Sequence, residues 1–300
     1  MIVYLDQNKW IQIARVVHGK DRDQSVSVLT AMAEAGTLQL PLSAMHYIET
    51  ARTSNEGRRE RLGTVMWRLS RGQTLLSQRE IVIYESEVAL SQVFPSIRPR
   101  KLALLGIGAS HAFGIDYSSH LPPAVRLRFE RTLVTGECFN GRRPPHFSSE
   151  QHRLAFQKHL SDFRAILEQD LPQERWTDAL RAMSLVEVLE PLYQAAALHG
   201  ISTELLEGLG TERLTRLVDA MPSRQVDIHL HLQVLKNKQY LPKKHDLEDW
   251  GALGIAAAYC DAVVCEKHFR DLIARDGFQT KATVLRDLSE LLPLVEHTDA

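Results

Sequence analysis

The sequence is poor in cysteine and contains no long apolar run. Three cysteines without C-x-x-C spacing exclude a disulfide scaffold and predict reduced thiols. The longest apolar candidate, Leu253 to Cys265, is interrupted by Asp261 and is shorter than the ~20 residues of a membrane helix. Met1 opens directly into an apolar segment, unlike a signal peptide. A cytoplasmic protein with no membrane partner is therefore expected.

Net charge and several common motifs are also lacking. The 36 Lys+Arg and 37 Asp+Glu residues almost cancel, so any case for a nucleic-acid partner must be local. The absence of G-x-x-x-x-G-K-[ST], G-x-G-x-x-G and G-x-S-x-G gives no support to a P-loop, a dinucleotide site or a serine hydrolase. There are 13 histidines, but no Cys/His pairs at finger spacing, so structural zinc is not expected. With 44% hydrophobic residues, the 300-residue chain still has enough apolar surface for a sizeable core.

The two ends of the chain have the pattern of an α/β domain. Short β-forming runs predict strands at Ile2–Leu5, Leu38–Leu42, Ala262–Cys265 and Ala282–Leu285. Apolar residues at helical spacing predict helices from Trp10, over Gln24–Ala35, after the cap Ser43, over Asp246–Tyr259 and over Leu288–Leu294. Strands that alternate with helices indicate a parallel sheet with crossover helices.

The middle of the chain is different, because almost no convincing strand is found between residues 57 and 240. Helical periodicity covers Ser77–Phe94, Ser149–Leu167, Gln173–Leu198 and Val226–Asn237. We therefore predict a discontinuous α/β domain, residues 1–56 and 241–300, with a mostly α-helical insert over residues 57–240.

Acidic residues gather where the predicted strands end. Asp6 ends the first strand and Glu266 follows the strand Ala262–Cys265, while Asp246 and Asp249 open the helix before that strand and Glu49 lies in the helix after the second strand. Because parallel strands end at one edge of a sheet, these acids are expected to converge there. Clustered carboxylates repel one another unless a cation neutralises them, and Mg²⁺ or Mn²⁺ prefers such oxygen ligands. One or two such ions suit phosphodiester hydrolysis.

Each acid also has a structural alternative. Asp6 would serve as a helix cap, Glu49 as a partner of Arg52, and the remaining acids as helix N-terminal charges. Asp261 is predicted to be structural, because it opens the strand that Glu266 follows and lies ~16 Å away at the other edge.

Basic residues flank the predicted acidic site. Arginines are dense from Arg52 to Arg71, and lysines from Lys236 to Lys244, where they would neutralise phosphates or form solvated helix faces. Arg224 is a further candidate phosphate ligand, and Lys267 directly follows Glu266.

Together these segments resemble the PIN-domain nucleases. The resemblance is carried by the strand Ile2-Val3-Tyr4-Leu5-Asp6 with Asn8, by the mid-helix Glu49, and by Asp249 before a small-residue helix that leads into Val263-Val264-Cys265-Glu266-Lys267-His268-Phe269. It covers roughly the first 55 and the last 60 residues. Glu266 stands where the family usually has Asp, and the helical insert is absent from the minimal fold.

The resemblance implies a three-layer α/β/α PIN-like parallel sheet built from both chain ends. It implies that the catalytic metal ligands are Asp6, Glu49, Asp249 and Glu266, with Asp246 as a further metal ligand and an alternative to Asp249. The residues expected to bind substrate are Asn8, Arg52, Arg224 and Lys267.

The expected activity is that of a Mg²⁺- or Mn²⁺-dependent endoribonuclease, in which a metal-activated water attacks the phosphorus of single-stranded RNA. The insert would select substrate, form a homodimer or dock a cognate inhibitor protein. A toxin or defence role follows from family analogy alone. Two alternatives stay open: a structure-specific DNA nuclease, and a non-enzymatic PIN-like scaffold whose helical insert binds a partner.

Overall fold

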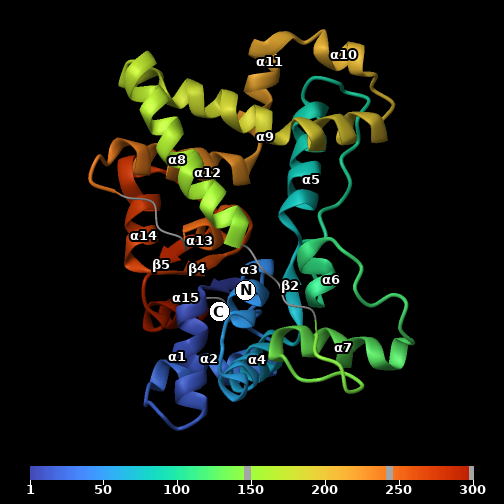
Figure 1. The fold of residues 1–300 in the computed structure, drawn as a ribbon, viewed down its shortest axis with the longest axis vertical. Coiled ribbons are helices and arrows are strands. Elements are labelled where there is room, and N and C mark those ends of the chain that lie inside the picture. Colours follow the sequence, from blue (N-terminus) through green and yellow to red (C-terminus); the bar gives the residue numbers. More distant parts are fainter. Residues whose placement is uncertain (145–149, 241–245, 297–300) are drawn as a thin grey trace.

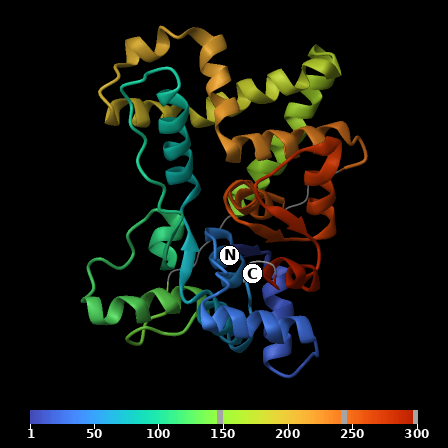
Figure 2. The same cartoon turned by 180° about the vertical axis from the view of Figure 1, so that it is seen from behind.

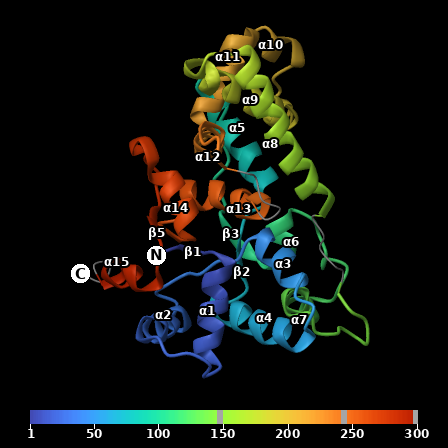
Figure 3. The ribbon, with the colours of Figure 1, turned by 60° about the vertical axis from the view of Figure 1, so that its left-hand side comes forward.

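A computed structural model describes residues 1–144, 150–240 and 246–296 (Figure 1). For residues 150, 152, 153, 246–249 and 296 it describes the backbone only. The chain forms a mixed α/β fold in which a small parallel sheet lies between two groups of helices (Figures 1 and 3). Within the described ranges, no helix has both the length and the apolar composition needed to cross a membrane.

The central sheet is built from both ends of the chain, as predicted. Its three parallel strands lie in the order β1, β4, β5, and their bounds are Val3–Leu5, Ala262–Val264 and Thr283–Leu285. In the register Val3 pairs with Ala262, and Ala262 pairs with Thr283. All three strands therefore end at the same edge.

The prediction of a strand over Leu38–Leu42 is wrong, because this segment forms only isolated parallel bridges. Gln39 bridges to Ile2 of the first segment, and Leu42 bridges to Thr74. Pro41 lies between them and has no N–H to donate, so a continuous ladder cannot form. The segment still lies beside β1 and leads into the next helix at the shared edge.

The structure also contains a two-stranded antiparallel sheet inside the predicted helical insert, formed by β2 (Gln73–Leu75) and β3 (Leu105–Ile107), with α5 (Gln78–Ser91) between them in the chain. Each strand has only three residues, which is too short to show the alternation of a strand in the sequence.

Helices pack on both faces of the sheet, because successive strand residues point to opposite sides. Val3, Leu5 and Val264 face one core. That core is closed by α1 (Gln7–Val17), α2 (Gln24–Ala35), α3 (Ala44–Ala51), α4 (Glu56–Ser70), α6 (Gly108–Phe113), α7 (Pro123–Thr135), the 3₁₀ helix η4 (Leu288–Leu291) and α15 (Leu292–Glu296). Tyr4 and Val263 face the opposite core, with α12 (Pro222–Lys236), α13 (Asp246–Tyr259) and α14 (Lys267–Ala274).

The remaining helices form a third core above the sheet (Figures 1 and 2). They are α5 (Gln78–Ser91), α8 (Glu150–Asp170), α9 (Trp176–Leu198), α10 (Thr203–Glu207) and α11 (Gly210–Leu217). The buried Glu85 of α5 accepts hydrogen bonds from Ser223 N and Oγ at 2.7 and 2.6 Å and from the Tyr259 hydroxyl at 2.8 Å. This carboxylate therefore joins the upper helices to α12 and α13.

The cores do not follow the predicted insert boundary. Leu62, Val65, Met66 and Leu69 of α4 lie beyond residue 57 but pack in the same core as β1. Helix α12 likewise contributes to the core that contains α13.

Candidate functional site

The edge at which the strands end carries two of the predicted acids. Asp6 follows β1 and its N–H donates to the Val264 carbonyl at 2.9 Å. Glu266 follows β4 and forms the N-cap of α14. The Asn8 amide donates a hydrogen bond to the Glu266 carboxylate, so the first turn of α1 joins the two strand ends.

Asp6 is nearly buried, with 9% of its surface exposed. Burial, followed by the negative charge of Glu266, raises the pKa of Asp6 from its usual value to about 6. Lys9 and the N–H groups of Gln7 and Asn8 lower this pKa, but the two raising effects outweigh them. The fold thus keeps a carboxyl group in a place where ionisation is unfavourable without a further cation. Such groups are concentrated at functional sites.

Helix α3 is fixed to the same edge by His46. The imidazole Nδ1 accepts from the Ser43 N–H at 2.8 Å, so the ring proton is on Nε2, which donates to the Leu5 carbonyl at 2.8 Å. Burial lowers the pKa of His46 to about 4, which keeps the ring neutral. Because both ring nitrogens are engaged, His46 positions the helix and has no free nitrogen for a ligand.

Glu49 lies one turn after His46 and is half-buried. The next residue, Thr50, accepts a hydrogen bond from the Gln7 side-chain amide at 3.2 Å, so α3 crosses the start of α1 beside Asp6. Glu49 therefore belongs to a helix whose first turn is fixed at this edge, and its role as a metal ligand stays a prediction.

Asp246 and Asp249 lie in the first turn of α13, where the structure describes their backbone but not their side chains. Only Cys260 and Asp261 separate α13 from β4, so the chain reverses and the start of α13 lies toward the edge at which β4 ends. The 14 residues of α13 span ~21 Å, against ~10 Å for a three-residue strand. Gly251 packs on Met45, since an added Cβ would lie 3.3 Å from its Cε. The choice between Asp246 and Asp249 stays open.

Asp261 lies at the opposite edge, as predicted. Its Oδ2 accepts from the Ile2 N–H at 2.8 Å, and Oδ1 lies 3.3 Å from the Lys281 ammonium. These contacts give Asp261 a structural role.

Two of the predicted substrate-binding residues are close in sequence to the candidate acids. Arg52 is half-buried at the end of α3 and lines a polar pocket of about 360 Å³ together with Arg59 and Glu60. Lys267 is exposed in the first turn of α14, directly after Glu266.

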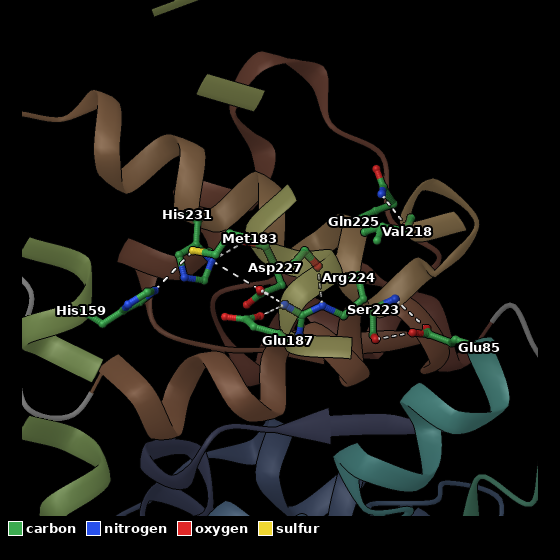
Figure 4. Close-up of polar contacts among 11 residues, drawn as sticks. Glu85, His159, Met183, Glu187, Val218, Ser223, Arg224, Gln225, Asp227 and His231 are labelled. Atoms are coloured by element: carbon green, nitrogen blue, oxygen red, sulfur yellow. Dashed lines mark hydrogen bonds and ion pairs between the residues drawn. The ribbon is translucent and has the colours of Figure 1, made fainter. Parts of the chain in front are cut away.

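Arg224 is placed differently from the sequence prediction (Figure 4). It is 6% exposed, and its guanidinium donates to Ser184 at 2.9 Å, Glu187 at 2.5 Å and Asp227 at 2.6 Å. Two carboxylates already balance its charge, so this position favours a structural role over phosphate binding.

The same cluster contains a residue pair that the sequence analysis missed. Asp227 Oδ2 lies 3.4 Å from Nδ1 of His231, and both line a cavity of about 490 Å³ with Trp250. The signal in the sequence was the spacing of Arg224, Asp227 and His231 at i, i+3 and i+7, which places three complementary side chains on one helix face.

Among the side chains that the structure describes, no group of three or more His, Cys, Asp or Glu residues is close enough to hold a metal ion. The side chains of Asp246 and Asp249 are not part of that set. No protein-family model matches the chain, and neither a curated protein nor a solved structure is similar to it.

Proposed function

We propose that this chain is a PIN-like, divalent-metal-dependent endonuclease that cleaves single-stranded RNA. The proposal includes a three-layer α/β/α arrangement of the sheet and its covering helices. The observation that carries it is the buried Asp6 beside Glu266 at the edge where the parallel strands end. The starts of α3 and α13 lie toward the same edge; Asp246 and Asp249 are in the first turn of α13, and Glu49 lies one turn after His46 in α3.

The donor set fits a hard cation. Asp6, Glu266 and Glu49 offer carboxylate oxygens, and Asp246 or Asp249 would complete the set. Glu266 is one methylene longer than the Asp usual in PIN domains, and its carboxylate accepts a hydrogen bond from Asn8 in the first turn of α1, two residues after Asp6. When bound, Mg²⁺ or Mn²⁺ would supply Lewis-acid stabilisation of the phosphate and lower the pKa of the attacking water.

The residues of the chain have separate tasks in this proposal. Asn8 orients Glu266, and His46 fixes α3 to the end of β1. Arg52 follows Glu49 by three residues and Lys267 directly follows Glu266, and both would bind the phosphate backbone of the substrate. A toxin or defence role, and an inhibitor protein as partner, belong to the proposal by analogy only.

The test is cleavage of a mixed RNA pool by the purified chain in Mn²⁺, with EDTA as the first control. Asp6→Asn and Asp249→Asn are expected to reduce the rate about 100-fold or more, as removal of a charge-stabilising catalytic group does. Asp261→Asn, an acid at the opposite edge of the same sheet, is expected to keep the wild-type rate.

Cleavage that survives both EDTA and Asp6→Asn would contradict the proposal. Preferential cleavage of flap DNA would replace RNA by DNA as the substrate. An intact pool of both nucleic acids would favour the scaffold alternative.

A further inference from the structure

A groove with basic walls lies between α1 and α4, away from the acids. Its volume is about 390 Å³. The floor is apolar and consists of Ile11, Ala14 and Leu62. The exposed rim, which we call the basic rim, consists of Arg15, His18, Lys20, Arg58 and Arg61. Among the side chains that the structure describes, no acid lines the groove.

The helix geometry explains why these cations face one another. Arg58 and Arg61 are three residues apart on α4, and Arg15 and His18 are three residues apart at the end of α1, so each pair shares a helix face. Helices α1 and α4 pack together through Ile13, Ala14, Leu62 and Val65 in one core. The two basic faces therefore border the same depression.

The basic rim is poorly neutralised. Arg15 Nε lies 3.5 Å from Asp21 Oδ2, and within the described ranges Lys20, Arg58 and Arg61 have no carboxylate at ion-pair distance. Some exposed arginines elsewhere are paired, for example Arg216 with Glu212 at 2.5 Å, whereas others, such as Arg128 and Arg213, have no carboxylate at ion-pair distance among the described residues, so the distinction of the basic rim is that its cations border one groove. Four permanent cations thus border the groove with a single carboxylate at ion-pair distance, which gives the groove a net positive charge that attracts anions.

The groove is also connected to the candidate site. Helix α1 starts directly after Asp6 and carries Arg15 nine residues later, ~13 Å along the helix axis. One short strand of nucleic acid would reach from the acids to the basic rim along this helix.

We propose that the basic rim binds the sugar–phosphate backbone of single-stranded RNA, with bases resting on the apolar floor. A concave groove with cations on its borders fits a flexible single strand better than a duplex, whose phosphates lie on a convex surface. The choice of RNA over other polyanions rests on the proposed function, whereas the demand for an anionic chain comes from the groove itself.

The test measures the anisotropy of fluorescein-labelled single-stranded RNA in EDTA over a range of salt concentrations. The double variant Arg58→Gln/Arg61→Gln is expected to bind about tenfold more weakly at 0.1 M salt. The slope of log K against log salt is expected to fall by up to ~1.4, since each single-strand contact contributes ~0.7. The matched control is Arg213→Gln/Arg216→Gln, which removes two exposed arginines at the same spacing on α11.

Equal binding by the wild type and the Arg58/Arg61 variant, with unchanged melting temperatures, would overturn the proposal. So would tighter binding of duplex DNA, or of phosphatidylserine vesicles, that depends on the same two arginines. Because binding is measured in EDTA, this result is separate from the nuclease proposal. Binding of RNA that depends on Arg58 and Arg61, without cleavage in Mn²⁺, would support the RNA groove and contradict the nuclease. Cleavage in Mn²⁺ together with equal binding by the wild type and the variant would support the nuclease and contradict the RNA groove.

Discussion

At the scale of single residues, the most informative position is Asp6. Burying a carboxylate beside another acid opposes folding unless the charge has a use. Glu266 is exposed and bonded to Asn8, and its negative charge raises the pKa of Asp6. Stability is therefore lower than it would be with a neutral residue at this position, as is common at functional sites.

Asp6→Asn is expected to raise the free energy of unfolding by on the order of 1 kcal/mol at pH 7 in EDTA, because the amide is neutral and nearly isosteric. Asp261→Asn is the control and is expected to lower the free energy of unfolding, because Asp261 pairs with Lys281 and bonds to Ile2. Urea denaturation of the wild type, Asp6→Asn and Asp261→Asn measures both changes in the free energy of unfolding. A marked loss of stability in Asp6→Asn would make Asp6 a structural helix cap.

The acids at the strand ends were predictable because each follows a short buried strand, and strands end where the sheet ends. Arg224 was placed differently because its sequence neighbourhood, Pro222-Ser223-Arg224, gives no sign that Glu187 and Ser184 lie against it from α9. Contacts between distant segments do not show in local patterns.

At the scale of elements, α12 carries a buried charge cluster whose stability depends on pH. Burial raises the pKa of Asp227, but the charges of His231 and Arg224 outweigh burial and hold this pKa at about 2. Burial lowers the pKa of His231, but Asp227 and Glu187 outweigh burial and raise it. Because the pKa of Asp227 is lowered in the folded state, the ionised carboxylate stabilises the fold above about pH 4, and this stabilisation is lost as the pH falls toward 2. Because the pKa of His231 is raised in the folded state, the protonated ring stabilises the fold below about pH 6.5, and this stabilisation is lost as the pH rises through the pKa of His231 in the folded state.

His231→Gln is therefore expected to lower the free energy of unfolding by about 2 kcal/mol at pH 5.5, and by less than half of that at pH 9. Denaturant titrations at the two pH values measure the difference. The exposed His120→Gln serves as control. An equal loss at both pH values would show that the ring packs against Trp250 and Phe156 without an ionic contribution.

Elements with clear signals at both ends were predicted with their bounds. Helix α2 matches Gln24–Ala35, where Asp23 caps the start and Gly36 adopts the left-handed conformation at φ 83°. Helix α13 matches Asp246–Tyr259. Where a local rule interrupted the pattern, as Pro41 does, the strand was reduced to bridges.

At the scale of the whole molecule, the two chain ends form one sheet, and the long middle segment contributes to all three cores. The pairing of the ends followed from the alternation of strands and helices. The packing of α4 beneath β1 did not follow, because an arginine-rich helix shows its apolar face only at Leu62, Val65, Met66 and Leu69.

The proposed metal centre lies at the edge of the sheet where segments from both chain ends meet. Direct Mn²⁺ binding, by calorimetry or by the electron paramagnetic resonance signal of the free ion, tests it without any substrate. We expect wild-type protein and Asp261→Asn to bind Mn²⁺ alike, and Asp6→Asn to bind it at least about tenfold more weakly, as loss of a metal ligand requires. Equal binding by Asp6→Asn and the wild type would contradict the account.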